Sequence, residues 1–81
     1  MFTVQIKRSI VVVKDFPGLG EKLKRFRHGD SRTLTQICQD ANISRSYWHQ
    51  LENEDLRAPA SEEIIRKIEE TLGVDLGVTF D

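Results

Sequence analysis

One stretch, residues 33–52, decides the fold, and its sequence is TLTQICQDANISRSYWHQLE. Its apolar residues recur at helical spacing and predict two short helices, over about 34–41 and 45–53. Only Asn42-Ile43-Ser44 separate the two helices, and the middle residue of this connection is apolar. Because the connection is so short, the helices must cross steeply and share a small core.

Both helices carry capping signals at their ends. Thr33 stands three residues before Gln36. At this spacing the hydroxyl accepts a bond from the Gln36 amide, and the Gln36 side chain returns a bond to the start of the helix. Asn42 tolerates the left-handed backbone that a tight helix exit needs, and Ser44 is a preferred residue for capping the next helix.

The second of the two helices has an apolar side and a polar side. With successive residues 100° apart on a helical wheel, Tyr47, Trp48 and Leu51 form a compact apolar arc. The remaining face is polar and consists of Arg45, Ser46, His49, Gln50 and Asn53. Arginine suits guanine, and glutamine and asparagine suit adenine, so this face can hydrogen-bond base edges. A face that is simply solvated is the alternative interpretation.

Helical periodicity continues on both sides of this stretch. Leu19, Leu23 and Phe26 form one stripe of a helix over about 18–27. Another helix starts at Ser61, which is followed by two glutamates in the first turn. Its expected core face consists of Ile64, Ile65, Ile68 and Leu72.

The two ends of the chain have strand character instead. Alternation over residues 2–7 and the β-branched run 10–13 favour either one long strand or two short ones. The remaining strand candidate is the tail, residues 78–80, and residues 53–60 are expected to be loop. Since a lone strand leaves its backbone groups without partners, we expect the two ends to pair, or the strand to pair across a dimer.

Residues 33–52 resemble the helix-turn-helix of the Cro/C1-type (XRE-like) family of bacterial and phage DNA-binding regulators. The flanks agree, since LGEKLKRFR at 19–27 is similar to that family's first helix and APASEEIIRKIEETLGV at 58–74 to its closing helices. The resemblance covers about 19–74. It implies a mainly α fold, a four-to-five-helix bundle of the lambda-repressor-like type, to which this chain adds an N-terminal β-strand. The expected division is a strand arm at 1–17, the helix-turn-helix domain at 18–77 and a tail at 78–81.

Three positions depart from the pattern of that family. Cys38 stands where the family generally has alanine, and Asn42 replaces the usual turn glycine. Leu34 occupies a position where better-studied repressors often carry a glutamine that contacts the DNA backbone and braces the recognition helix. We expect this brace to be missing unless Gln36 or Arg32 supplies it.

The resemblance implies a role for each polar residue of the motif. The implied base readers are Arg45, Ser46, His49 and Gln50, with Asn53 at the helix exit. The implied phosphate contacts are Arg32, Thr33, Thr35 and Tyr47. Such domains read the major groove and bind as dimers to two half-sites. Because an apolar edge strand on a small domain would otherwise promote aggregation, the expected dimerisation residues are Ile10, Val11, Val12 and Val13.

The charge distribution is compatible with an anionic partner. The 81 residues have a net charge of −1, but residues 1–52 carry +4 and residues 53–81 carry −5. A chain polarised in this way can offer a positive face to DNA, and ordinary surface charge is the alternative interpretation. Its acidic half and its strand also suit a protein-interaction module, such as an antitoxin or an adaptor subunit.

The composition argues against other classes of protein. A single cysteine, Cys38, excludes an intramolecular disulfide framework and a cysteine-cluster zinc site. A catalytic pair of Cys38 and His49 would need an exposed thiol, whereas the helical pattern buries it. The apolar run 10–13 is far shorter than the roughly 20 residues of a membrane span. We therefore expect a cytoplasmic, non-enzymatic protein that needs no cofactor or metal.

Overall fold

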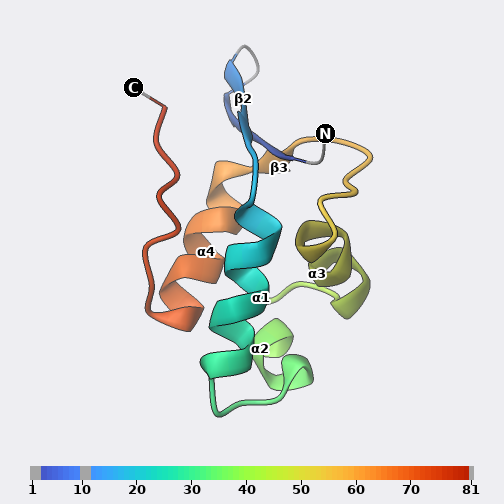
Figure 1. Cartoon of the computed structure of the whole chain (residues 1–81), viewed down its shortest axis with the longest axis vertical. Coiled ribbons are helices and arrows are strands. Elements are labelled where there is room, and N and C mark those ends of the chain that lie inside the picture. Colours follow the sequence, from blue (N-terminus) through green and yellow to red (C-terminus); the bar gives the residue numbers. More distant parts are fainter. Residues whose placement is uncertain (1–2, 10–11, 81) are drawn as a thin grey trace.

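In the computed structural model, which describes residues 3–9 and 12–80, four helices and three short strands surround one core (Figure 1). The hairpin of the first two strands lies at one end of the molecule and α2 lies at the other. The elements are β1 (Val4–Ser9), β2 (Val12–Phe16), α1 (Leu19–Gly29), α2 (Leu34–Ala41), α3 (Arg45–Glu52), β3 (Ala60–Ser61) and α4 (Glu62–Leu72).

The capping signals are largely confirmed. The Gln36 amide donates to the Thr33 hydroxyl at 3.2 Å, and the Tyr47 amide donates to the Ser44 hydroxyl at 3.0 Å. Asn42 adopts φ 58°, the left-handed exit expected for it. One part of the prediction is wrong, because the Gln36 side chain donates to Asp40 at 2.8 Å instead of closing the capping box. The side-chain nitrogen of Gln36 donates to a charged acceptor one turn further along the helix, which turns this side chain away from the Thr33 amide.

Helix boundaries differ from the prediction by one or two residues, and the first helix begins at Leu19 instead of residue 18. The first helix continues to Gly29 instead of ending near residue 27, and α3 ends one residue early, at Glu52. In α4, Ile65 and Ile68 are buried while Ile64 and Leu72 are half-buried, so the expected core face is confirmed. The α4 helix ends at Gly73, which has a positive φ of 67°.

The N-terminal segment forms two short strands, one of the two arrangements left open by the sequence. The strand order is β2-β1-β3, with β1 antiparallel to β2 and parallel to β3. The expected strand pairing with the tail is wrong, because residues 74–80 form no strand. Ala60, in a segment predicted to be loop, takes that place beside Ile6.

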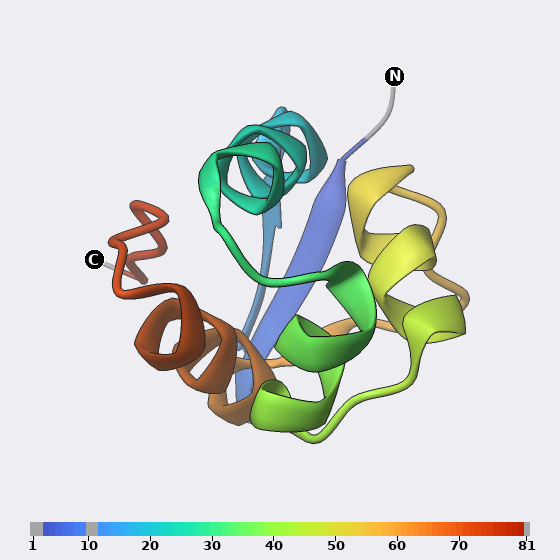
Figure 2. The same ribbon diagram turned by 90° about the horizontal axis from the view of Figure 1, so that it is seen from below.

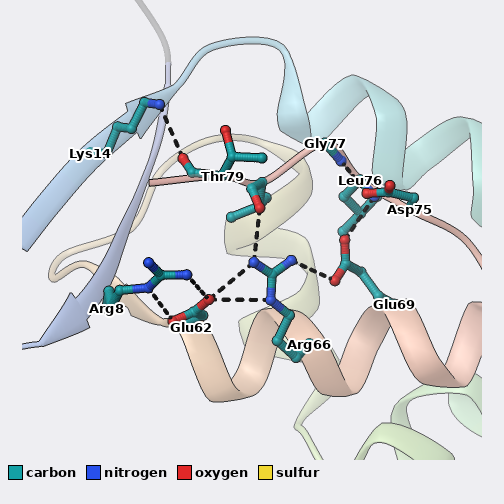
Figure 3. Close-up of polar contacts among 10 residues, drawn as sticks. Arg8, Lys14, Glu62, Arg66, Glu69, Asp75, Leu76, Gly77 and Thr79 are labelled. Atoms are coloured by element: carbon teal, nitrogen blue, oxygen red, sulfur yellow. Dashed lines mark hydrogen bonds and ion pairs between the residues drawn. The ribbon is translucent and has the colours of Figure 1, made fainter. Parts of the chain in front are cut away.

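Residues 74–80 instead cover the core with their side chains. Leu76 and Val78 are buried, and their carbonyl groups accept bonds from Lys22 and Arg66. Figure 3 shows Arg66 between Glu62 and Glu69 on α4, with the Val78 carbonyl as a further acceptor. The tail therefore follows α4 and the hairpin without joining the sheet.

The packing leaves one helix at the edge of the molecule. Seen from below in Figure 2, α3 lies on the side opposite α4 and the tail, with α1 and α2 between them. Figure 1 gives the same arrangement. No helix among the described residues is long and apolar enough to cross a membrane.

Candidate nucleic-acid interface

The α3 helix is anchored to the core by its apolar arc. Trp48 and Leu51 are fully buried, and Tyr47 is half-buried, which raises the pKa of its phenol through desolvation. The polar face points outward: Arg45, Ser46, His49 and Asn53 are exposed, and Gln50 is half-buried. The burial expected from the helical wheel is thus confirmed, and the five polar residues remain together on one surface.

Glu52, the last residue of α3, ties this helix to α1. Its carboxylate accepts two bonds from Arg27, at 2.5 and 3.0 Å, and one from the indole nitrogen of Trp48. Burial alone would raise the pKa of Glu52, but the bonds from Arg27 and Trp48 outweigh it and lower the pKa. Because the Glu52 side chain is only 6 % exposed, little water competes for these bonds. This ion pair fixes the C-terminal end of α3.

A close backbone contact supports the same end of α3. A Cβ atom at Gly20 would collide with the carbonyl oxygen of Glu52 and lie 2.8 Å from that of Leu51. Only glycine allows α1 to approach α3 this closely. The Gly20 amide also donates to the Glu54 carboxylate at 3.2 Å, which satisfies one free amide at the start of α1.

Of the candidate phosphate contacts near the start of α2, two threonines are exposed, while Arg32 is engaged in internal bonds. Thr33 and Thr35 are exposed beside the first amides of the helix. Arg32, in contrast, donates to Asp30, to Asp40 and to the Thr71 carbonyl at the end of α4. To reach a phosphate, Arg32 would have to release these bonds.

The sequence reasoning missed two features of this surface. The first is the contact of Glu52 with Arg27, which holds α3 against α1, and its sequence signal is the i,i+4 spacing of Trp48 and Glu52 on one helix. Arg57 lies exposed in the loop after α3 and forms no ion pair within residues 3–9 and 12–80. Its sequence signal is a basic residue a few positions after the helix predicted over 45–53.

The arginines of the described residues divide into those held in internal ion pairs and those that form none. Four arginines, namely Arg8, Arg27, Arg32 and Arg66, are held in ion pairs with acidic residues. Arg45 forms none in the part of the chain that the structure describes, so its guanidinium is available to an external anion. The described residues contain no cluster of three or more metal-ligating side chains.

Comparison with known protein families supports this assignment of the motif. A family model described as a helix-turn-helix domain, from the Cro/C1-type (XRE) group, matches residues 18–79. Neither the curated proteins nor the solved structures give a match to the chain. The matched segment includes all four helices and ends within the tail.

Proposed function

The chain belongs to the helix-turn-helix domain family, and from this premise we propose that it is a sequence-specific transcriptional regulator that binds double-stranded DNA as a homodimer. The observation that carries the proposal is that α3 exposes a polar face while Trp48 and Leu51, on its opposite side, are buried in the core. Members of this family bind DNA through such a helix, and they are typically not enzymes.

In this proposal α3 enters the major groove. Its base readers are Arg45, Ser46, His49 and Gln50, with Asn53 at the end of the helix. Arg45 is the residue best placed to recognise guanine, because its guanidinium forms no internal ion pair among the described residues. Gln50 offers the side-chain amide that suits adenine.

The phosphate contacts in this proposal come from α2 and α3. Thr33 and Thr35 lie at the start of α2, where free backbone amides and the helix dipole favour an anion. Tyr47 contributes its hydroxyl from α3. These contacts set the position of the domain on the duplex, and the base contacts set the sequence.

The proposal assigns a different role to each of three segments of the chain. Residues 18–77 form the DNA-binding domain, residues 1–17 form an arm for dimerisation, and residues 78–81 form a tail. In the arm, Ile10 and Val11 lie outside the described residues, while Val12 and Val13 are exposed on β2.

The test is fluorescence anisotropy against a selected pool of duplexes at two salt concentrations. We expect enrichment of a roughly palindromic site and an affinity that falls as salt rises. Replacing Arg45 and Gln50 by alanine should each weaken binding to that site about 10-fold to 100-fold, since one base contact contributes about 1–3 kcal/mol. The matched control is Lys67→Ala, which removes a positive charge from α4, on the other side of the molecule (Figure 2).

Two results would change the proposal. If affinity survives the Arg45→Ala, Gln50→Ala pair at every sequence, α3 is not the reading helix. If no duplex binds even at low salt, the second candidate function applies, a protein-interaction module such as an antitoxin or adaptor subunit. The observation that favours this candidate is the number of arginines already neutralised by internal ion pairs.

A further inference from the structure

We infer that two copies of the chain pair edge to edge through β2, in an antiparallel register that places Val13 of one copy opposite Val13 of the other. The inference rests on the proposed dimeric regulator for its purpose, and it names the surface and the register that hold the dimer together. It uses only the described residues of the arm.

The first observation is an open sheet edge. In the strand order β2-β1-β3, β2 is the last strand, and its outer edge pairs with no other strand of the described chain. An open edge offers a row of backbone donors and acceptors to another strand. Val12 and Val13, which are 38 % and 46 % exposed, lie on opposite faces of this strand, so a second strand at the edge would cover apolar surface on both faces.

Symmetry restricts the register of such a pairing. In an antiparallel ladder, hydrogen-bonded and non-hydrogen-bonded residue pairs alternate, so a two-fold axis perpendicular to the sheet must pass through a pair and not between pairs. One residue of β2 therefore faces its own counterpart. The choice of that residue fixes every other pair in the ladder.

Charge excludes two of the possible registers. A ladder centred on Lys14 opposes two ammonium groups, and one centred on Asp15 opposes two carboxylates, which is destabilising. A ladder centred on Val13 pairs two valines at the axis and places Lys14 opposite Val12 of the second copy. In this register the three central residue pairs all lie within β2 (Val12–Phe16). A ladder centred on Val12 or on Phe16 has only its central pair within β2.

The same symmetry suits a shared DNA duplex. The helices cover one face of the sheet, since Val4 and Ile6 of β1 are fully buried while Gln5 and Lys7 are exposed on the other face. A two-fold axis perpendicular to the sheet maps the covered face of one copy onto the covered face of the other. Both α3 helices would then lie on the same side of a continuous sheet formed by the two three-stranded sheets.

Charge exchange at position 13 tests this register without DNA. Sedimentation equilibrium should give the wild-type protein about twice its 9.3 kDa chain mass. The variants V13D and V13K should each dissociate, with a dimer dissociation constant raised about tenfold or more, because each opposes like charges at the axis. Mixing V13D with V13K should restore the dimer, since the opposed groups then attract.

A cross-linking experiment tests the same register with a strand that carries no added charge. The variant V13C should form an intermolecular disulfide on mild oxidation, because directly opposed residues bring their Cβ atoms close to disulfide distance. The matched control is D15C, which lies on the same face of the sheet. In this register the two residues substituted at position 15 of a dimer are four residues apart along the strands, too far to form a disulfide. Wild type controls for Cys38, which is buried.

The outcomes separate this inference from the proposed function. A wild-type monomer, unchanged dimers in V13D and V13K, no restoration on mixing, or cross-linking of D15C as fast as V13C would each overturn the register. A wild-type monomer would also remove the homodimer from the proposed function, but because none of these measurements contains DNA, DNA binding by α3 would still be decided by anisotropy. Loss of DNA binding with an intact Val13 dimer would overturn the function alone.

Discussion

Replacing Glu52 by glutamine tests whether the ion pair with Arg27 holds the end of α3. Glutamine keeps an oxygen that can accept from the Trp48 indole, but it removes the negative charge that pairs with Arg27. Losing one partner of a buried ion pair costs about 3–5 kcal/mol, because the other charge stays behind. Since the Arg27 side chain is 21 % exposed and can regain some hydration, we expect about 2–4 kcal/mol here.

This loss is large for a domain of 81 residues, whose free energy of unfolding is expected to be about 4–12 kcal/mol. Urea titration followed by far-ultraviolet circular dichroism and by Trp48 fluorescence measures it directly. With a slope of about 1 kcal/mol per molar urea, the midpoint should fall by about 2 M or more. Glu63→Gln, at an exposed position in the first turn of α4, is the matched control and should lower the midpoint far less, because it removes only an interaction with the helix dipole.

The pH dependence of stability provides a second test of the same variant, E52Q. The pKa of Glu52 in the folded protein lies below the ordinary 4.5, so its stabilising effect is complete above about pH 4.5 and is lost as pH falls through the lowered pKa. The difference in stability between wild type and E52Q should therefore shrink in acid. A difference below about 0.5 kcal/mol at neutral pH, or one that grows in acid, would refute the argument that this ion pair braces α3.

Two further predictions concern other contacts of the same framework. Gly20→Ala should destabilise the fold by about 1–3 kcal/mol despite the better helix propensity of alanine, because the new Cβ meets backbone carbonyls of α3. Thermal unfolding measures this loss. The control is Gly29→Ala, whose Cβ meets nothing within 4 Å and which should be neutral or slightly stabilising. Bonds from the Arg32 side chain and backbone hold the pKa of Asp30 at about 2, below the ordinary 3.8. Asp30→Asn should therefore be less stable than wild type at about pH 6, and the difference should shrink as pH falls below about 3.8. A difference at about pH 2 as large as the one at about pH 6 would contradict this assignment.

The helices were predictable because their signals are local. Thr33, Ser44 and Ser61 each accept a bond from an amide three residues ahead, so a few neighbouring letters are enough to locate each helix start. The left-handed exit at Asn42 is equally local. Burial of Trp48 and Leu51 followed from helical periodicity alone.

The sheet and the tail were less predictable because their contacts are distant in sequence. Ile6 pairs with Ala60 across more than fifty residues, and β3 is only two residues long, too short to produce an alternating pattern. The tail has β-branched residues at 78 and 79, but its backbone carbonyls are satisfied by Lys14, Lys22 and Arg66 instead of by a strand. Composition alone does not distinguish these two ways of satisfying a backbone.

Charged side chains were the hardest part of the site to assign from sequence. Arg27, Arg32 and Arg45 have the same chemistry, and helical spacing does not reveal which of them has an internal acidic partner. The structure separates them, since Arg27 binds Glu52, Arg32 binds Asp30 and Asp40, and Arg45 forms no ion pair among the described residues.

This separation has a consequence for how the proposed regulator binds DNA. With Arg8, Arg27 and Arg32 held in internal ion pairs, three of the nine basic residues in 1–52 are already engaged before any phosphate is bound. Affinity that does not depend on sequence scales with the number of phosphates neutralised, so one copy should bind any duplex weakly and with a shallow salt dependence. Useful affinity must then come from base contacts and from two copies acting on two half-sites. The V13D variant should therefore lose affinity for the palindromic site while its α3 surface is unchanged, and an unchanged affinity would mean that one copy binds well enough alone.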